Sequence, residues 1–179
     1  NVMTRDHGFQ PIRWIGSASI CAATLAVTPS LRPIRIRKDA LAANIPNADL
    51  MVSPQHRVLV RSKIAERLFG ASEVLVAAKQ LLSLDGIEIA EDLPEVEYFH
   101  ILFDQHEIIL SNGAETESLY TGVEALKFVG PAARKEIFAI FPELNVPAYQ
   151  AHAAREIVPG RNARKLAGRH QTHSRPLVN

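Results

Sequence analysis

Short segments with the pattern of β-strands, separated by turn residues, fill the first part of the chain. Some of these segments alternate polar and apolar side chains, and others are brief apolar runs that end at a turn, as strands do when one or both of their faces are buried. Four segments have this character: Gln10–Gly16, Pro33–Arg37, Leu50–Val52 and Val58–Val60. The last two predict a strand that enters a turn at His56 and emerges again. The pattern predicts an all-β domain over residues 1–125.

A second group of segments completes this domain. Tyr98–Phe103 and Glu107–Leu110 are apolar runs on either side of Asp104-Gln105-His106, and Ser111-Asn112-Gly113 closes the second run. This arrangement predicts a β-hairpin with an acidic tip. Residues 73–84 fit a helix as well as a short strand, and we expect a strand.

The pattern changes to a helical one after Gly122. Pro131 suits the first turn of a helix, and the apolar positions Ile137, Phe138 and Phe141 form a stripe that ends at Pro142. A second helix, basic on its outer face, is predicted over 161–170, and 171–179 is expected to be disordered or loosely tethered. Residues 126–179 are therefore expected to form a helical extension with a basic tail.

Composition limits the class of protein. With 179 residues, 47% of them hydrophobic and 22% charged, the chain can form one globular domain with an appendage. No apolar run approaches the roughly 20 residues that cross a bilayer, so we expect no membrane association. Cys21 is the only cysteine, which excludes an internal disulfide and a zinc site built from several thiolates. We expect Cys21 to be a small buried hydrophobic residue.

Charge is distributed unevenly along the chain. Residues 85–118 hold ten acidic residues and no Lys or Arg, whereas residues 151–179 hold six basic residues and one acidic residue. We expect the basic tail to dock on the acidic segment. The aromatic interleaving that marks nucleic-acid binding is absent, so we predict no nucleic-acid partner.

The segment with the clearest chemical potential is Val52–Val60, in which Ser53 precedes His56 by three positions. A histidine in this setting can protonate the departing nitrogen of a peptide bond, and a nearby hydroxyl can orient it or stabilise the oxyanion. A turn histidine that is hydrogen-bonded only to backbone is the alternative interpretation. The segment resembles the hydroxyl-x-x-His motif of the Hint family, which contains Hedgehog processing domains and inteins.

Two more segments resemble the same family. Tyr98, Asp104, His106 and Asn112-Gly113 occur in the order of the late intein motif, with one extra residue after His106. Thr4–Gly16 is similar to the opening strands of a bacterial Hint subgroup. The resemblance covers roughly Val2 to Tyr120 and implies an all-β Hint fold with a short C-terminal helical extension.

The resemblance implies cofactor-free, single-turnover autoproteolysis through an N–S or N–O acyl shift, with the chain's own upstream polypeptide as substrate. It implies that His56 hydrogen-bonds the scissile nitrogen, that Ser53 takes the place of the usual threonine, and that Asp104 assists proton transfer at the nucleophile. His106, in the same motif as Asp104, is a fourth candidate catalytic residue. A metal site at His7, His100 and His106 with Asp104 is disfavoured, because no tight ligand pair occurs, and we predict neither metal nor cofactor.

Two departures from the family affect the expected activity. The family nucleophile lies upstream of the segment that matches Thr4–Gly16, and this sequence begins after that position. We therefore expect the nucleophile to be missing and the domain to be inactive by itself. The His-Asn ending of inteins is replaced by Thr116-Glu117-Ser118, so one-sided cleavage is expected rather than splicing.

A non-catalytic, β-rich interaction or scaffold module is the rival hypothesis. Convergence of Ser53, His56 and Asp104 on one cavity would favour catalysis, and scattered positions would favour the rival. The sequence does not determine the oligomeric state or the cellular compartment. Bacterial members of the family that it resembles often form part of larger secreted proteins.

Overall fold

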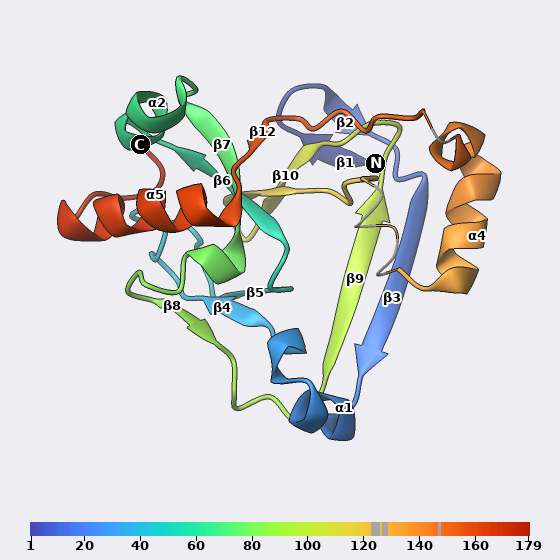
Figure 1. Cartoon of the computed structure of the whole chain (residues 1–179), viewed down its shortest axis with the longest axis horizontal. Helices are drawn as coiled ribbons and strands as arrows, with labels where there is room; N and C mark the ends of the chain where they lie inside the picture. The colour runs from blue at the N-terminus through green and yellow to red at the C-terminus, as the bar shows by residue number, and fades with distance from the viewer. Residues whose placement is uncertain (123–125, 127–128, 147) are drawn as a thin grey trace.

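The structure is a computed structural model that describes residues 1–122, 126, 129–146 and 148–179. As expected, strands dominate it (Figure 1). The described strands are β1 (Val2–Thr4), β2 (Gly8–Gln10), β3 (Trp14–Ile20), β4 (Ile34–Ile36), β5 (Leu50–Val52), β6 (Arg57–Arg61), β7 (Glu73–Ala77), β8 (Ile87–Ile89), β9 (Val96–Leu102), β10 (Ile108–Ser111), β11 (Ala114–Glu117) and β12 (Glu156–Ile157).

The largest sheet has the strand order β12-β7-β6-β11-β10-β1-β2. All its neighbours are antiparallel except β12, which runs parallel to β7. Strands β6 and β7 are buried at their three central positions, because both faces of the sheet are covered there. Val58 and Val60 face the main core, whereas Leu59 faces a smaller cluster with Leu75 and Ile108, as the alternation of a strand requires.

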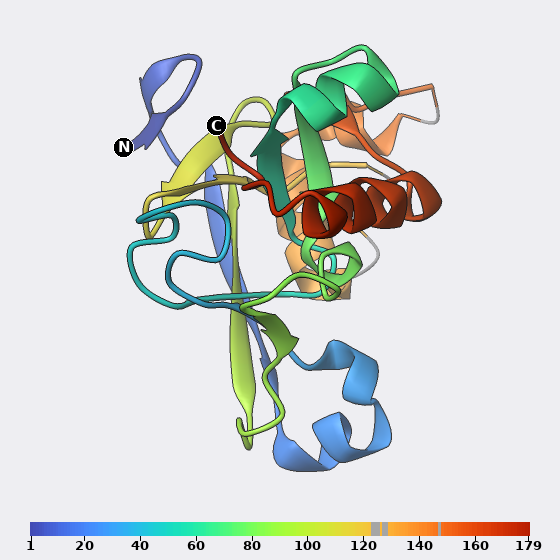
Figure 2. The same ribbon diagram turned by 90° about the vertical axis from the view of Figure 1, so that its left-hand side faces the viewer.

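Two smaller sheets adjoin this one. Strands β5, β4 and β8 form a three-stranded sheet whose inward residues, such as Ile34 and Ile36, join the main core. Strands β3 and β9 form a long two-stranded ribbon, paired from Trp14 with Leu102 to Ile20 with Val96. The ribbon extends away from the large sheet (Figure 2). Ile15 and Phe99 on the ribbon are 60% and 65% exposed.

The described helices cover the sheets and the ribbon. Helix α2 begins after Ser62, whose Oγ accepts a hydrogen bond from the N–H of Ala65, and ends at Gly70 with φ of 76°. Helix α5 packs against α2 and β7, and α4 packs on Trp14 of the ribbon. The helical elements are α1 (Ala22–Val27), η1 (Pro29–Leu31), α2 (Lys63–Phe69), η2 (Ala78–Gln80), α4 (Pro131–Ile140), η3 (Pro142–Asn145) and α5 (Gly160–Thr172). No helix in the described ranges has the length and apolar character needed to cross a membrane.

Several local predictions are confirmed. A strand occupies Glu73–Ala77 within the ambiguous segment, α4 begins at Pro131 and ends before Pro142, and α5 spans the second predicted helix. Residue 125, the predicted domain boundary, lies outside the described residues.

The strand pairing differs from the prediction. The segments on either side of Asp104 do not form a hairpin, because β9 pairs with β3 while β10 pairs with β11 and β1. The strand predicted over 10–16 is interrupted at residues 11–13, between β2 and β3. Helices α1 and α2 lie in the part of the chain for which only strands were predicted. Partner choice over such distances depends on the whole sheet, which local alternation does not encode.

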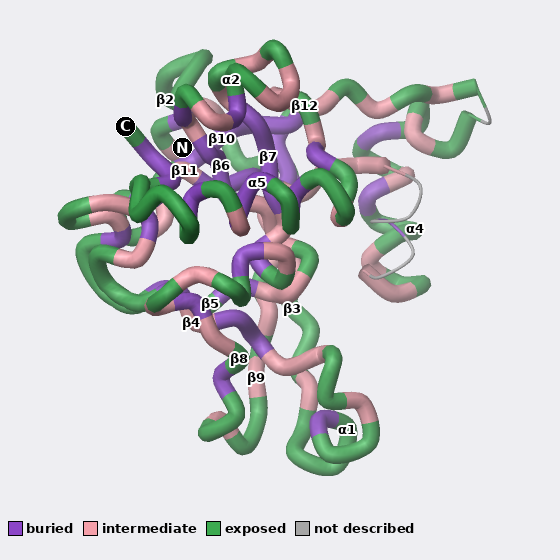
Figure 3. The backbone as a smooth tube through the Cα atoms, turned by 60° about the vertical axis from the view of Figure 1, so that its left-hand side comes forward, coloured by how far each residue is buried: buried purple, intermediate pink, exposed green. Residues whose placement is uncertain are grey.

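The prediction of a loosely tethered C-terminus is wrong. Leu177 and Val178 are 2% and 8% exposed and belong to the main core. The N–H of Leu177 donates to the carbonyl of Leu41, and Val178 forms a parallel bridge with Arg61. Figure 3 shows α5 with alternating buried and exposed stretches, and the chain buried just before its C-terminal end.

Two expectations based on composition are also wrong. Within the described residues, the tail pairs with carboxylates outside the acidic segment, since Arg155 contacts Asp6 and Glu73. The acidic segment instead pairs with arginines from earlier in the chain, as Glu88 does with Arg35. Cys21 is exposed rather than buried.

Candidate functional site

The turn between β5 and β6 presents His56. The N–H of His56 donates to the carbonyl of Ser53 at 3.0 Å, which closes a four-residue turn with Pro54 at its second position. Two further bonds tie the turn to η2: the N–H of Ala78 donates to the carbonyl of His56 at 2.9 Å, and that of Lys79 donates to the carbonyl of Pro54 at 3.1 Å. The backbone around His56 is therefore fixed by contacts on both sides.

The imidazole of His56 is buried at its reactive end. Part of the residue reaches solvent, but its Nε2 atom is enclosed and has no hydrogen-bond partner in the described structure. Burial lowers the pKa of His56, against the opposing influence of the Glu117 charge. The ring is therefore neutral near pH 7 and keeps one nitrogen available. Such an unsatisfied buried atom is uncommon in folded proteins and points to a functional position.

Glu117 is the electrostatic centre beside this turn. It ends β11, which pairs with β6 through Thr116 and Val58, and its side chain is 6% exposed. Its Oε1 accepts the backbone N–H of Arg57 at 2.9 Å, and its Oε2 accepts the Arg57 guanidinium at 2.9 Å. Burial acts to raise the pKa of Glu117, but the hydrogen bond from His106 and the charge of Arg57 outweigh it, so the pKa is lowered. The carboxylate stays ionised.

His106 is held in one tautomer by its two partners. The N–H of Ala154 donates to Nδ1 at 3.1 Å, so the ring proton resides on Nε2 and is donated to Glu117 Oε2 at 3.1 Å. Tyr120 packs against the ring with centroids 5.1 Å apart, and the Arg57 guanidinium lies 5.6 Å from the Tyr120 centroid. We call His56, Arg57, His106 and Glu117 the His56 site.

The four residues predicted from the sequence do not all meet at this site. Ser53 and His56 share one turn, and His106 contacts Glu117, whose charge acts on His56. Asp104 lies on the turn between β9 and β10, where it is 56% exposed and paired with Arg13. No hydrogen bond or ion pair recorded for the described residues links Asp104 to His56. The role predicted for Asp104 therefore stays a prediction.

Sequence reasoning missed Arg57 and Glu117. A signal was present: an arginine that opens the buried strand β6 requires a buried counter-ion, and a carboxylate at the end of β11 can supply it. Pairing the two required the knowledge that β11 lies next to β6.

Cys21 does not belong to the His56 site. His100, whose charge acts on His56, lies opposite Gly16 in the ribbon, and Cys21 follows the end of β3 five residues further along. At the usual rise of a strand this separation is about 17 Å. Hydrogen bonding with Thr24 lowers the pKa of the exposed Cys21 thiol.

Comparison with known families decides the assignment. The model of the Hint domain family matches residues 1–123, more than two thirds of the chain. The chain belongs to the Hint domain family. No curated protein and no solved structure matches it. Hint domains are generally autoprocessing, splicing-like domains, and the strand-rich architecture with short helices agrees with the expected fold.

Among the described residues, no group of three or more His, Cys, Asp or Glu side chains is placed to hold a metal ion.

Proposed function

We propose that this Hint domain supports autoproteolysis of its own polypeptide, with His56 hydrogen-bonded to the nitrogen of the scissile peptide bond. The observation that carries the proposal is the enclosed, unpaired Nε2 of His56. A buried polar atom without a partner is unfavourable unless a group that enters the site supplies one. The amide nitrogen of a peptide bond fits this requirement, because it needs a proton in order to depart.

The chemistry balances as an acyl shift. A thiol or hydroxyl attacks the carbonyl carbon, a C–S or C–O bond forms, and the C–N bond breaks. The nucleophile loses its proton and the departing nitrogen gains one through the His56 imidazole. That proton passes from the nucleophile to His56 and from His56 to the departing nitrogen. Ser53, in the same turn, supplies a hydroxyl for the oxyanion. A role for Asp104 in assisting this transfer would require it to leave its ion pair with Arg13.

Arg57, His106 and Glu117 act as positioning residues in this scheme. Their hydrogen bonds fix the start of β6 directly after His56. The nearby carboxylate stabilises the imidazolium that forms when His56 takes up a proton, because opposite charges interact strongly where water is excluded. His56 is neutral at rest and can therefore accept a proton, and the Glu117 carboxylate stabilises the protonated ring. These two properties suit a group that shuttles a proton.

We further propose that residues 1–179 do not complete this reaction alone. The one cysteine, Cys21, lies about 17 Å along the ribbon from the level of His100, so its thiol does not face the His56 site. The upstream position of the nucleophile rests on the resemblance to other Hint domains, in which it precedes the segment that matches Thr4–Gly16. We propose one-sided cleavage rather than splicing, because Thr116-Glu117-Ser118 stands in place of the His-Asn ending of inteins. We also propose that the chain is a member of the bacterial Hint subgroup and forms part of a larger secreted protein.

The rival hypothesis remains a non-catalytic interaction module. The exposure of Asp104, its ion pair with Arg13, and the exposed apolar side chains Ile15 and Phe99 of the ribbon favour it. In that case His56 and its neighbours would act only in folding.

The experiment uses the complete open reading frame that contains this chain, with a reporter protein placed upstream. We expect time-dependent cleavage that thiols or hydroxylamine accelerate, and loss of this cleavage in His56→Ala. His152→Ala, which removes an exposed histidine, is the matched control and should cleave normally. Unchanged cleavage in His56→Ala would refute the role of His56, and no cleavage in any protein would favour the interaction module.

A second fusion tests the proposed inactivity. Residues 1–179 joined directly to the reporter should remain intact under the same conditions. Cleavage of this fusion, abolished by Cys21→Ala, would show that Cys21 reaches the site and would overturn the proposal.

A further inference from the structure

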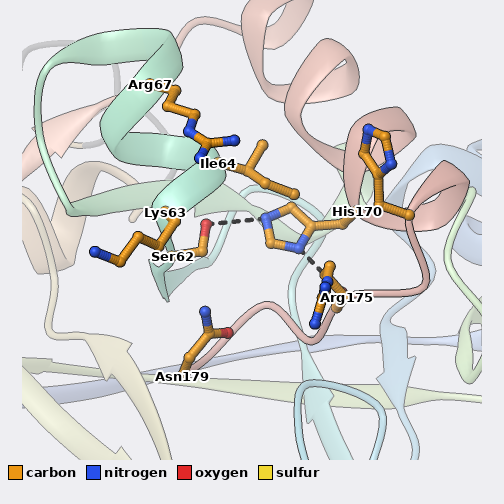
Figure 4. A pocket seen from close by; sticks show the side chains of 8 residues that line it. Ser62, Lys63, Ile64, Arg67, His170, Arg175 and Asn179 are labelled. Atoms are coloured by element: carbon orange, nitrogen blue, oxygen red, sulfur yellow. Dashed lines mark hydrogen bonds between the residues drawn. The ribbon is translucent and has the colours of Figure 1, made fainter.

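A hollow separate from the His56 site lies between α2 and the chain that follows α5. Its volume is about 440 Å³, within the range of sites that take small molecules. Figure 4 shows Lys63 and Arg67 on the α2 side, and His170 and Arg175 on the side of α5 and its continuation. We call this hollow the α2–α5 pocket.

The floor of the α2–α5 pocket is a neutral, satisfied hydrogen-bond chain. His170 Nδ1–H donates to the carbonyl of Arg175 at 3.0 Å, so Nε2 accepts the Ser62 hydroxyl at 3.0 Å. Burial lowers the pKa of His170, which keeps the ring uncharged near pH 7. Ser62 and His170 are 5% and 1% exposed, and they fix the two walls relative to each other.

The walls carry positive charge that the described part of the chain does not balance. Lys63, Arg67 and Arg175 are exposed, and their side chains make no ion pair or hydrogen bond within the described residues. His173 also lines the pocket and adds a further charge when protonated. No Asp or Glu is among the lining residues. Seven other arginines are paired with carboxylates: Arg5, Arg13, Arg35, Arg37, Arg57, Arg61 and Arg155. Arg32, Arg134, Arg161, Arg164 and Arg169 form no ion pair among the described residues either, but they do not line this pocket.

We propose that the α2–α5 pocket binds a small molecule through a phosphate or diphosphate group. Guanidinium groups match the geometry of phosphate oxygens and form charge-assisted, bidentate hydrogen bonds with them. Three unpaired cations around one hollow favour a multiply charged anion over a single carboxylate. This ligand would bridge α2 and the C-terminal segment, and so would stabilise the packing of that segment on the core.

The phosphate group could come from a soluble compound or from a lipid headgroup, and two arms of one experiment separate these sources. In the first arm, inorganic pyrophosphate is titrated into the ¹⁵N-labelled chain while amide shifts are followed by NMR. In the second, the chain is sedimented with vesicles that contain phosphatidic acid. Binding in the first arm alone supports a soluble ligand, and binding to vesicles as well supports a headgroup.

We expect saturable shifts around Ser62 and His170 and a rise in melting temperature with pyrophosphate. The double variant Arg67→Gln/Arg175→Gln should weaken binding about tenfold or more, since it removes two charge-assisted hydrogen-bond donors. Arg161→Gln is the matched control, because Arg161 is exposed on α5 but does not line the pocket.

Three results would overturn the proposal. The first is an absence of shifts with pyrophosphate. The second is equal weakening by Arg161→Gln, which would indicate nonspecific attraction to a basic surface. The third is equal binding of succinate at the same ionic strength, which would show no preference for phosphate. The melting temperature of each free variant is measured first, so that a loss of binding is not confused with a loss of folding.

Discussion

The neutrality of buried His56 can be tested through the pH dependence of folding. In the unfolded chain a histidine titrates near pH 6.5, whereas burial lowers the pKa of His56 in the folded protein. As pH falls below 6.5, the unfolded state takes up a proton that the folded state does not. The folded protein therefore loses stability from this group toward acid.

The size of this loss follows from linkage. Each pH unit over which the two states differ by one proton changes the free energy of unfolding by about 1.4 kcal/mol. Between pH 7.5 and 5.5 the unfolded imidazole takes up almost one proton, so the limiting loss is about 1.4 kcal/mol. The negative charge of Glu117 opposes the effect of burial, so we expect a loss that does not exceed this limit.

The substitution His56→Gln removes this contribution because glutamine does not titrate. Urea denaturation of both proteins at pH 7.5 and 5.5 gives the two losses of unfolding free energy, and their difference isolates His56. His7, His100 and His170 are present in both proteins and their contributions cancel. His152→Gln reports the effect of removing an exposed histidine. If the parent chain and His56→Gln lose the same stability, the folded imidazole protonates freely and the neutral resting state is wrong.

Three further substitutions test other parts of the structure by urea denaturation. Glu117→Gln should lower the free energy of unfolding by about 1–3 kcal/mol at pH 7. The difference in stability between this variant and the parent chain should vanish as pH falls through the lowered pKa of Glu117. An unchanged stability at pH 7 would contradict the anchoring role of Glu117. Leu177→Ala should lose about 2–5 kcal/mol because Leu177 is 2% exposed, while Leu110→Ala, at 61% exposure, should change stability by less than about 0.5 kcal/mol; equal effects would mean that the C-terminal segment is not part of the core. Ser62→Ala should lose about 1–2 kcal/mol, since it removes both the cap of α2 and the partner of His170; a loss below about 0.5 kcal/mol would argue against these two bonds.

Local sequence determined the elements and the turn that carries the site. Alternation and short apolar runs predicted strands at 50–52 and 58–60 with His56 between them, and the structure has β5 and β6 on either side of this turn. Pro131 and Pro142 delimited α4. These features depend on residues adjacent in the chain, whose backbone preferences and side-chain periodicity act without knowledge of the rest of the fold.

Only the tertiary structure decided which residues meet. Arg57 and Glu117 are 60 positions apart and come together because β11 lies beside β6. His106 receives its bond from Ala154, 48 positions away. Asp104, four positions before Ile108 of β10, instead faces solvent beside Arg13. A shift of one residue in strand register would exchange buried and exposed side chains, so the sequence motif alone cannot fix these contacts.

The C-terminal segment shows the same division. The sequence predicted residues 171–179 to be disordered or loosely tethered, as chain ends often are. In the fold, Leu177 and Val178 fill the main core beside Leu41 and Arg61. The burial of two side chains, with backbone bonds on both sides, outweighs the entropy of ordering a short tail. Local pattern therefore specified several strands of this Hint domain and the helices α4 and α5, and packing between distant segments specified its site, its C-terminus and the α2–α5 pocket.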